Sequence, residues 1–89
     1  MEFDSFSYST PAVIQRNCFE QFVQGLSPTV YRVKGFVRFS EGTCLFNFVA
    51  GRWDLEPILV EKSVLIFVGK GLQSQKQQIL ETLKKCERT

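Results

Sequence analysis

In the segment Tyr31–Phe39, YRVKGFVRF, apolar and charged residues largely alternate. This is the pattern of an extended chain that buries one face. The first side carries Tyr31, Val33, Val37 and Phe39, and the second side carries Arg32, Lys34, Phe36 and Arg38. Alternation of aromatic and β-branched residues with period two predicts a β-strand rather than a helix. A half-buried strand needs partner strands beside it and a second layer over its apolar side.

Four further segments have strand patterns. They are residues 3–9, residues 43–50 after Glu41-Gly42, residues 53–58 after Gly51-Arg52, and residues 63–69. The last of these, SVLIFVG, is apolar on both sides, which predicts a central strand or one covered on both faces. Pro57 cannot donate to a β-ladder, so we expect the strand 53–58 to lie at an edge or to end there.

An amphipathic helix is predicted between the first two strands. Pro11 is suited to the first helical turn, Thr10 is a candidate N-cap, and Gly25 predicts the helix end. The apolar stripe is formed by Ile14, Cys18 and Phe22 at a spacing of four, widened by Phe19 and Val23. This spacing places all five side chains on one helical face.

A second helix is predicted from Ser74 to about Cys86, where Ser74 and Gln77 have the spacing of a capping box. The order is therefore strand, helix, four strands, helix. This order predicts an α+β fold, namely a two-layer sandwich with a mainly antiparallel sheet of four to five strands and two helices on one face. We expect residues 1–89 to form a single domain.

The two turns predict a strand register. The predicted pairs are Phe39 with Cys44, Val37 with Phe46, Gly35 with Phe48, Ala50 with Trp53, and Phe48 with Leu55. All of these residues are small or apolar, so this face should meet the helices. The opposite face brings Asp54 and Glu56 within one or two strands of Lys34 and Arg38. We therefore expect these cations to meet carboxylates of their own sheet.

The polar side of the sheet is a candidate protein-interaction face. It comprises Arg32, Lys34, Phe36, Arg38, Leu45, Asn47 and Val49. An apolar centre rimmed by charge on an open sheet is typical of a protein contact. Scattered exposed apolar residues are also common on protein surfaces, so both interpretations stay open at this point.

A basic-faced nucleic-acid or anion-binding module is the alternative, with Arg32, Lys34, Arg38 and Arg52 as the contacting cations. The net charge argues against nucleic acid, because 11 Lys and Arg residues stand against nine Asp and Glu residues, for a charge of +2. Binding of this kind would weaken steeply as the salt concentration rises.

Catalytic and metal chemistry have little support in this sequence. The chain has no histidine, which removes the commonest general base and metal ligand. Gly69-Lys70-Gly71 follows an apolar strand but lacks the rest of a Walker loop. We therefore predict no catalytic, metal-binding or nucleotide-binding residue in this chain.

The three cysteines, Cys18, Cys44 and Cys86, lie far apart and outside any Cys-x-x-Cys spacing. We expect three free, buried thiols in a reducing cytosol, and hence a cytoplasmic protein. No apolar run approaches the ~18 residues that a membrane-spanning helix needs, so no membrane partner is expected.

Residues 31–36, Tyr-Arg-Val-Lys-Gly-Phe, resemble the R-x-K-G strand of the C-terminal domain of CobW-type proteins. The flanking order is similar as well, over about residues 3–86. The matching motifs are the Gly25-Leu26 and Pro28 loop, Gly51-Arg52, Leu55-Glu56-Pro57, the strand Leu65–Gly69 and a closing helix.

The resemblance implies an interaction or regulatory domain without catalysis of its own, either excised or stand-alone. CobW-type proteins are cytoplasmic P-loop GTPases tied to cobalamin synthesis and to zinc or cobalt delivery. Their N-terminal domain holds the nucleotide site and a Cys-x-Cys-Cys metal motif. The implied partners are that GTPase domain of the parent protein and/or a metal-requiring client. GTP, Mg²⁺ and Zn²⁺ or Co²⁺ are implied for the parent, and no cofactor is implied for this chain.

Overall fold

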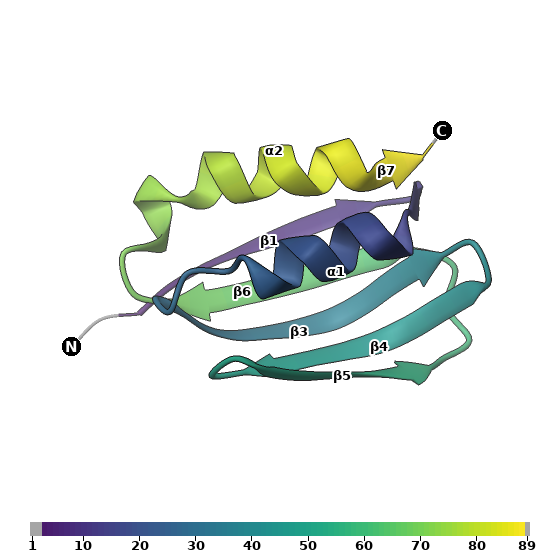
Figure 1. Cartoon of the computed structure of the whole chain (residues 1–89), viewed down its shortest axis with the longest axis horizontal. Helices are drawn as coiled ribbons and strands as arrows, with labels where there is room; N and C mark the ends of the chain where they lie inside the picture. The colour runs from purple at the N-terminus through teal and green to yellow at the C-terminus, as the bar shows by residue number, and fades with distance from the viewer. Residues whose placement is uncertain (1–2, 89) are drawn as a thin grey trace.

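A five-stranded antiparallel sheet and two helices form two layers (Figure 1). The computed structural model describes residues 3–88. The sheet strands are β1 (Asp4–Thr10), β3 (Val30–Phe39), β4 (Gly42–Val49), β5 (Arg52–Pro57) and β6 (Ser63–Gly69), in the spatial order β1-β6-β3-β4-β5. The helices are α1 (Arg16–Gln24) and α2 (Lys76–Cys86), with a 3₁₀ turn η1 (Leu72–Ser74). Two short strands, β2 (Val13–Ile14) and β7 (Glu87–Arg88), pair with each other.

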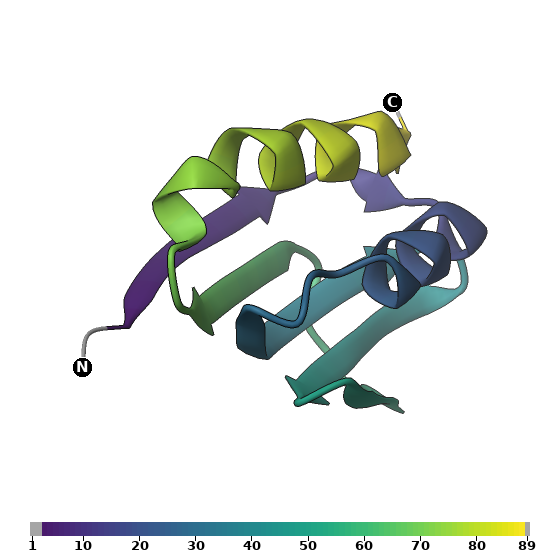
Figure 2. The ribbon, with the colours of Figure 1, turned by 60° about the vertical axis from the view of Figure 1, so that its left-hand side comes forward.

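Both helices lie on the same side of the sheet, as Figure 2 shows, which confirms the predicted two-layer α+β sandwich. Phe19 of α1 occupies the centre of the core and is fully buried. Its ring centroid lies 5.0 Å from that of Phe46 and 5.7 Å from that of Phe39, with both rings edge-on. The aromatic residues of the strands therefore meet the helical layer directly.

Helix α1 begins at Arg16, five residues later than predicted. The stretch after Pro11 is extended instead and forms β2. The Thr10 hydroxyl accepts a hydrogen bond from the Ala12 amide at 3.1 Å, so it closes a local turn and does not cap the helix. The predicted end at Gly25 is confirmed.

Helix α2 begins at Lys76, and the predicted capping box is absent. The Ser74 hydroxyl donates to the Gly71 carbonyl at 3.0 Å, within the turn that contains η1. The Gln77 side-chain amide donates to Glu81 one helical turn later. Both candidate capping groups therefore have other partners, and η1 supplies the turn that precedes the helix.

The first hairpin turns one residue earlier than predicted, which shifts every cross-strand partner by two residues. Ser40 and Glu41 form the turn, with Phe39 opposite Gly42. Gly42 has φ +139°, so the glycine follows the turn instead of forming it. Gly35 consequently lies opposite Phe46 rather than Phe48.

The second hairpin also turns one residue earlier, at Ala50 and Gly51, which again shifts the partners by two. Their φ values of 51° and 87° match a type I′ turn, which needs two positive φ angles in succession. Both predicted registers are therefore wrong by two residues. Side chains alternate with period two, so a shift of two leaves the residues paired in these two hairpins on their predicted faces.

An irregularity between Val30 and Arg32 in the pairing of β3 with β6 overturns one face assignment. Val30 takes the buried position with 2% exposure, whereas Tyr31 is 39% exposed. The ring of Tyr31 meets the ring of Phe3 edge-on, at 5.6 Å between centroids. Tyr31 therefore does not belong to the core side to which the alternation assigned it.

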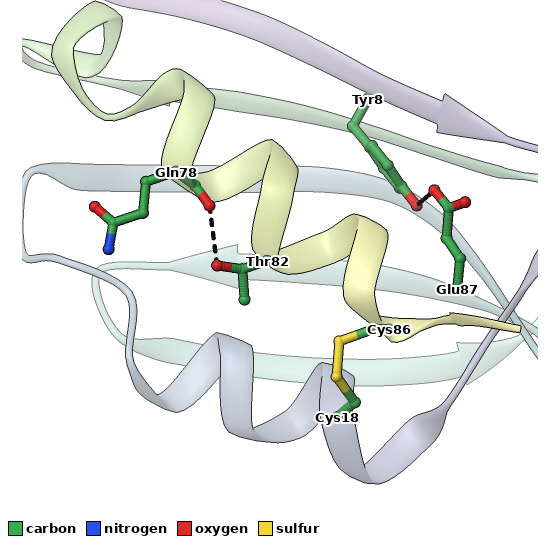
Figure 3. Close-up of a disulfide and its surroundings, with 6 residues drawn as sticks. All are labelled: Tyr8, Cys18, Gln78, Thr82, Cys86 and Glu87. Carbon is green, nitrogen blue, oxygen red and sulfur yellow. Dashed lines mark hydrogen bonds between the residues drawn. A yellow bond between two sulfur atoms is a disulfide. The ribbon is translucent and has the colours of Figure 1, made fainter.

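Cys18 of α1 and Cys86, the last residue of α2, form a disulfide with a Cα–Cα distance of 5.4 Å (Figure 3). Cys44 is free and buried. The prediction of three free thiols is therefore wrong for two of them. The spacing of the cysteines in the sequence could not predict this disulfide, because only the packing of α1 against α2 brings residues 18 and 86 together.

The C-terminal segment is also held by Tyr8 of β1. The Tyr8 hydroxyl donates to a Glu87 carboxylate oxygen at 2.6 Å (Figure 3). Burial of the phenol, reinforced by the adjacent Glu87 carboxylate, raises the pKa of Tyr8 far above its ordinary value of 10.0.

The raised pKa of Tyr8 predicts a loss of stability in alkali. Above about pH 10 the unfolded phenol ionises while the folded one keeps its proton, so the unfolded state binds fewer protons and stability falls as pH rises. Tyr8→Phe should remove up to about 1.4 kcal/mol per pH unit of this slope. Urea denaturation of both proteins from about pH 9.5 to 11.5 measures the difference, and parallel pH profiles would contradict the prediction.

Candidate interaction surface

The sheet face opposite α1 and α2 carries no helix within residues 3–88, and we call it the open face. Three rows of side chains cross the open face from β1 to β5. They are Ser9, Val64, Phe36, Leu45 and Glu56; Ser7, Ile66, Lys34, Asn47 and Asp54; and Ser5, Val68, Arg32, Val49 and Arg52. Each strand therefore contributes a column with its own chemistry: serines on β1, apolar residues on β6, and mainly charged residues on β5.

The apolar column of β6 forms the floor of a groove of about 450 Å³. The groove is lined by Arg32, Lys34, Gly35, Phe36, Val64, Ile66 and Val68, and we call it the β6 groove. Ile66 lies at its middle and is 50% exposed. A strand in the interior of a sheet that is apolar on both sides normally has both faces covered. Here only the helical side is covered within the described residues.

Cations and carboxylates on the open face remain apart. Lys34 lies opposite Asn47, and Asn47 lies opposite Asp54 on its other side. β3 and β5 are therefore two strand spacings apart, about 10 Å between backbones, and no ion pair joins them within residues 3–88. The ion pairs found in residues 3–88 join Arg16 to Glu20 and to Glu41, away from this face. The prediction that the sheet cations meet their own carboxylates is thus wrong.

Other hollows on the molecule have different linings. The cleft between the helices holds about 350 Å³ and is lined partly by the amides of Gln21, Gln75 and Gln78. A larger hollow of about 580 Å³ surrounds the turn at Ser40 and Glu41. Both mix polar and apolar groups, whereas the β6 groove has a continuous apolar floor with its cations on one side.

The family model of the cobalamin synthesis protein cobW C-terminal domain matches residues 3–87. The chain belongs to this family. The resemblance stated from the R-x-K-G strand is thereby confirmed. No curated protein matched the chain. No helix within residues 3–88 is long and apolar enough to cross a membrane.

Two solved structures share the fold of this CobW C-terminal domain. The Zn(II)-bound YjiA GTPase from E. coli is 15% identical with a TM-score of 0.75. A Zn(II)-bound triple mutant of YjiA GTPase is 13% identical with a TM-score of 0.79. Each similarity covers 97% of this chain and 30% of the other chain, so the domain spans less than a third of those proteins.

Three of the seven predicted face residues of this CobW C-terminal domain, Arg32, Lys34 and Phe36, line the β6 groove. Leu45, Asn47 and Val49 lie on β4 beside it. Arg38 is used differently: its guanidinium donates to the Pro11 carbonyl at 2.9 Å, and its amide donates to the Ser63 hydroxyl at 2.8 Å. Arg38 therefore ties a loop to the sheet at the end of the open face.

The β6 residues Val64, Ile66 and Val68 are absent from the predicted face. The signal was present in SVLIFVG, because helices on one face alone leave every second residue of an interior apolar strand uncovered. To include these residues in the predicted face, one must know how β6 pairs with β3. That pairing places Ile66 opposite Lys34 and Val64 opposite Phe36. No turn links these two strands directly, so their register could not be written from the sequence.

Proposed function

We propose that this CobW C-terminal domain is the interaction domain of a CobW-like, GTP-dependent metal chaperone, and that it docks on the GTPase domain of its parent protein through the β6 groove. The domain would perform no catalysis. GTP, Mg²⁺ and the delivered Zn²⁺ or Co²⁺ would be bound by the GTPase domain, in the cytoplasm. A metal-requiring client protein would be the second partner.

The family match and the GTPase relatives support the first part of this proposal. Both similar structures are YjiA GTPases in a Zn(II)-bound form, and most of each lies outside the region that this chain matches. A domain of this family therefore has a GTPase as a natural neighbour. Coupling to cobalamin synthesis is suggested by the family description alone.

The single observation that carries the docking site is the β6 groove. Val64, Ile66 and Val68 form an apolar strip along an interior strand, and full burial of one such side chain is worth about 1.5 to 3 kcal/mol. Arg32 and Lys34 border this strip and have no ion-pair partner among the described residues. A partner with an apolar ridge and carboxylates beside it would satisfy both features.

An amide NMR titration of this domain with its GTPase domain tests the proposal. We expect shifts in β3 and β6 at positions 32–36 and 64–68, which are larger with GTP and Zn²⁺ than without them. The helix amides at positions 16–24 serve as the internal control and should stay unchanged. The absence of any shift, or shifts confined to the helices, would reject docking through this groove.

A further inference from the structure

The disulfide and its surroundings point to a site that the proposed function does not use. Cys18 and Cys86 lie in the helical layer, on the side of the sheet opposite the β6 groove. Cys86 is 1% exposed, whereas Cys18 is only partly buried. The two cysteine residues of one bond therefore differ in their exposure to solvent.

The same region attaches the end of the described chain to the rest of the domain. The Gln15 amide donates to the Cys86 carbonyl at 2.8 Å. Glu87 and Arg88 pair with β2, and the Tyr8 hydroxyl bonds Glu87. Besides these polar contacts, the disulfide is the covalent link that holds α2 and β7 to α1.

We infer that Cys18 is a thiol–disulfide exchange site for a small thiol of the glutathione class, and that exchange there opens and closes a covalent clamp on the C-terminal segment. The inference is independent of docking, because neither cysteine lies on the open face.

The exchange balances with glutathione alone. A glutathione thiolate attacks the Cys18 sulfur, the bond between Cys18 and Cys86 breaks, and Cys86 leaves as a thiolate that takes a proton. A second glutathione thiolate attacks the glutathione sulfur of the mixed disulfide. Oxidised glutathione forms, and Cys18 leaves as a thiol after protonation. Oxidation is the reverse, with oxidised glutathione as the two-electron acceptor. Attack at Cys18 is favoured because Cys86 is enclosed by the core.

Alkylation under denaturing conditions tests the clamp in the intact chain. After equilibration with oxidised glutathione the wild type should show one reactive thiol, Cys44, and after excess reduced glutathione it should show three. The oxidised form should melt roughly 10 to 20 °C above the reduced form, because the bond closes a long loop in the unfolded chain. Cys44→Ala is the control and should keep the same melting difference.

Two further variants test the direction of attack. With oxidised glutathione, Cys86→Ala should form a mixed disulfide at Cys18. Cys18→Ala should form a mixed disulfide at Cys86 at least about tenfold more slowly. Intact-mass spectrometry measures both rates. The assignment of Cys18 would be overturned by equal rates. The clamp itself would be overturned if the wild type kept three thiols in oxidised glutathione, or if both redox forms melted together.

Discussion

Gly35→Ala is expected to destabilise the domain by about 3 to 5 kcal/mol, because it adds a backbone penalty to a clash between two paired strands. Gly35 has φ +153°, and a Cβ there would lie 2.8 Å from the Val64 carbonyl carbon and closer still to its oxygen. The obstacle is backbone and cannot rotate away, so β3 and β6 would have to separate. Urea denaturation followed by circular dichroism measures the loss.

Gly42→Ala is the matched control for this prediction. Gly42 has φ +139°, close to that of Gly35, but a Cβ there would meet nothing within 4 Å. This variant therefore isolates the backbone penalty, and we expect a loss of about 1 kcal/mol. Equal losses for the two variants would show that the close approach of β3 to β6 contributes nothing.

Ile66→Asp is expected to weaken docking on the GTPase domain at least about 100-fold, since it places a carboxylate in the apolar floor of the β6 groove. Calorimetric titration with the isolated GTPase domain measures the change. Ile66 is already 50% exposed, so the domain itself should stay folded, with a loss of about 1 kcal/mol or less.

Val49→Asp tests which half of the open face binds the partner. Val49 is 52% exposed, lies on the same face and is also β-branched, but it lies on β4 outside the groove. We expect this variant to bind within about threefold of the wild type, because a rim substitution changes little. A large effect at Val49 with none at Ile66 would move the contact to β4.

The faces of the strands could be predicted wherever the pairing is regular, because they depend there only on alternation. Val33, Val37 and Phe39 are all buried, as the pattern YRVKGFVRF requires. The register of each hairpin depends on which two residues occupy the central turn positions. The alternation of side chains does not determine that choice. Ala50 was a poor candidate for a turn position because its φ of 51° is unusual for a residue with a Cβ. Ala50 is a turn residue of the tight hairpin between β4 and β5, a type I′ turn that needs a positive φ at this position.

Contacts between distant segments account for the other differences. Pro11 and Thr10 carry a plausible helix-start signal, yet β7 from the far end of the chain pairs with β2 and keeps Val13 and Ile14 extended. The disulfide arises in the same way, across a sequence separation of 68. The β6 half of the candidate surface was missed for the same reason, since its register with β3 is set without a connecting turn.

The strand order has a consequence for how the domain forms during synthesis. β3, β4 and β5 are joined by tight turns and can pair as soon as all three have been made, whereas β1 precedes them and pairs only with β6, the last strand of the sheet. Until then Phe6 and Tyr8 of β1 have no strand beside them. These aromatic residues alternate with Ser5, Ser7 and Ser9, so the unpaired β1 segment contains no continuous apolar run. Polar residues that interrupt an apolar segment lower its tendency to aggregate while it is unpaired, and β1 then becomes one edge of the finished sheet.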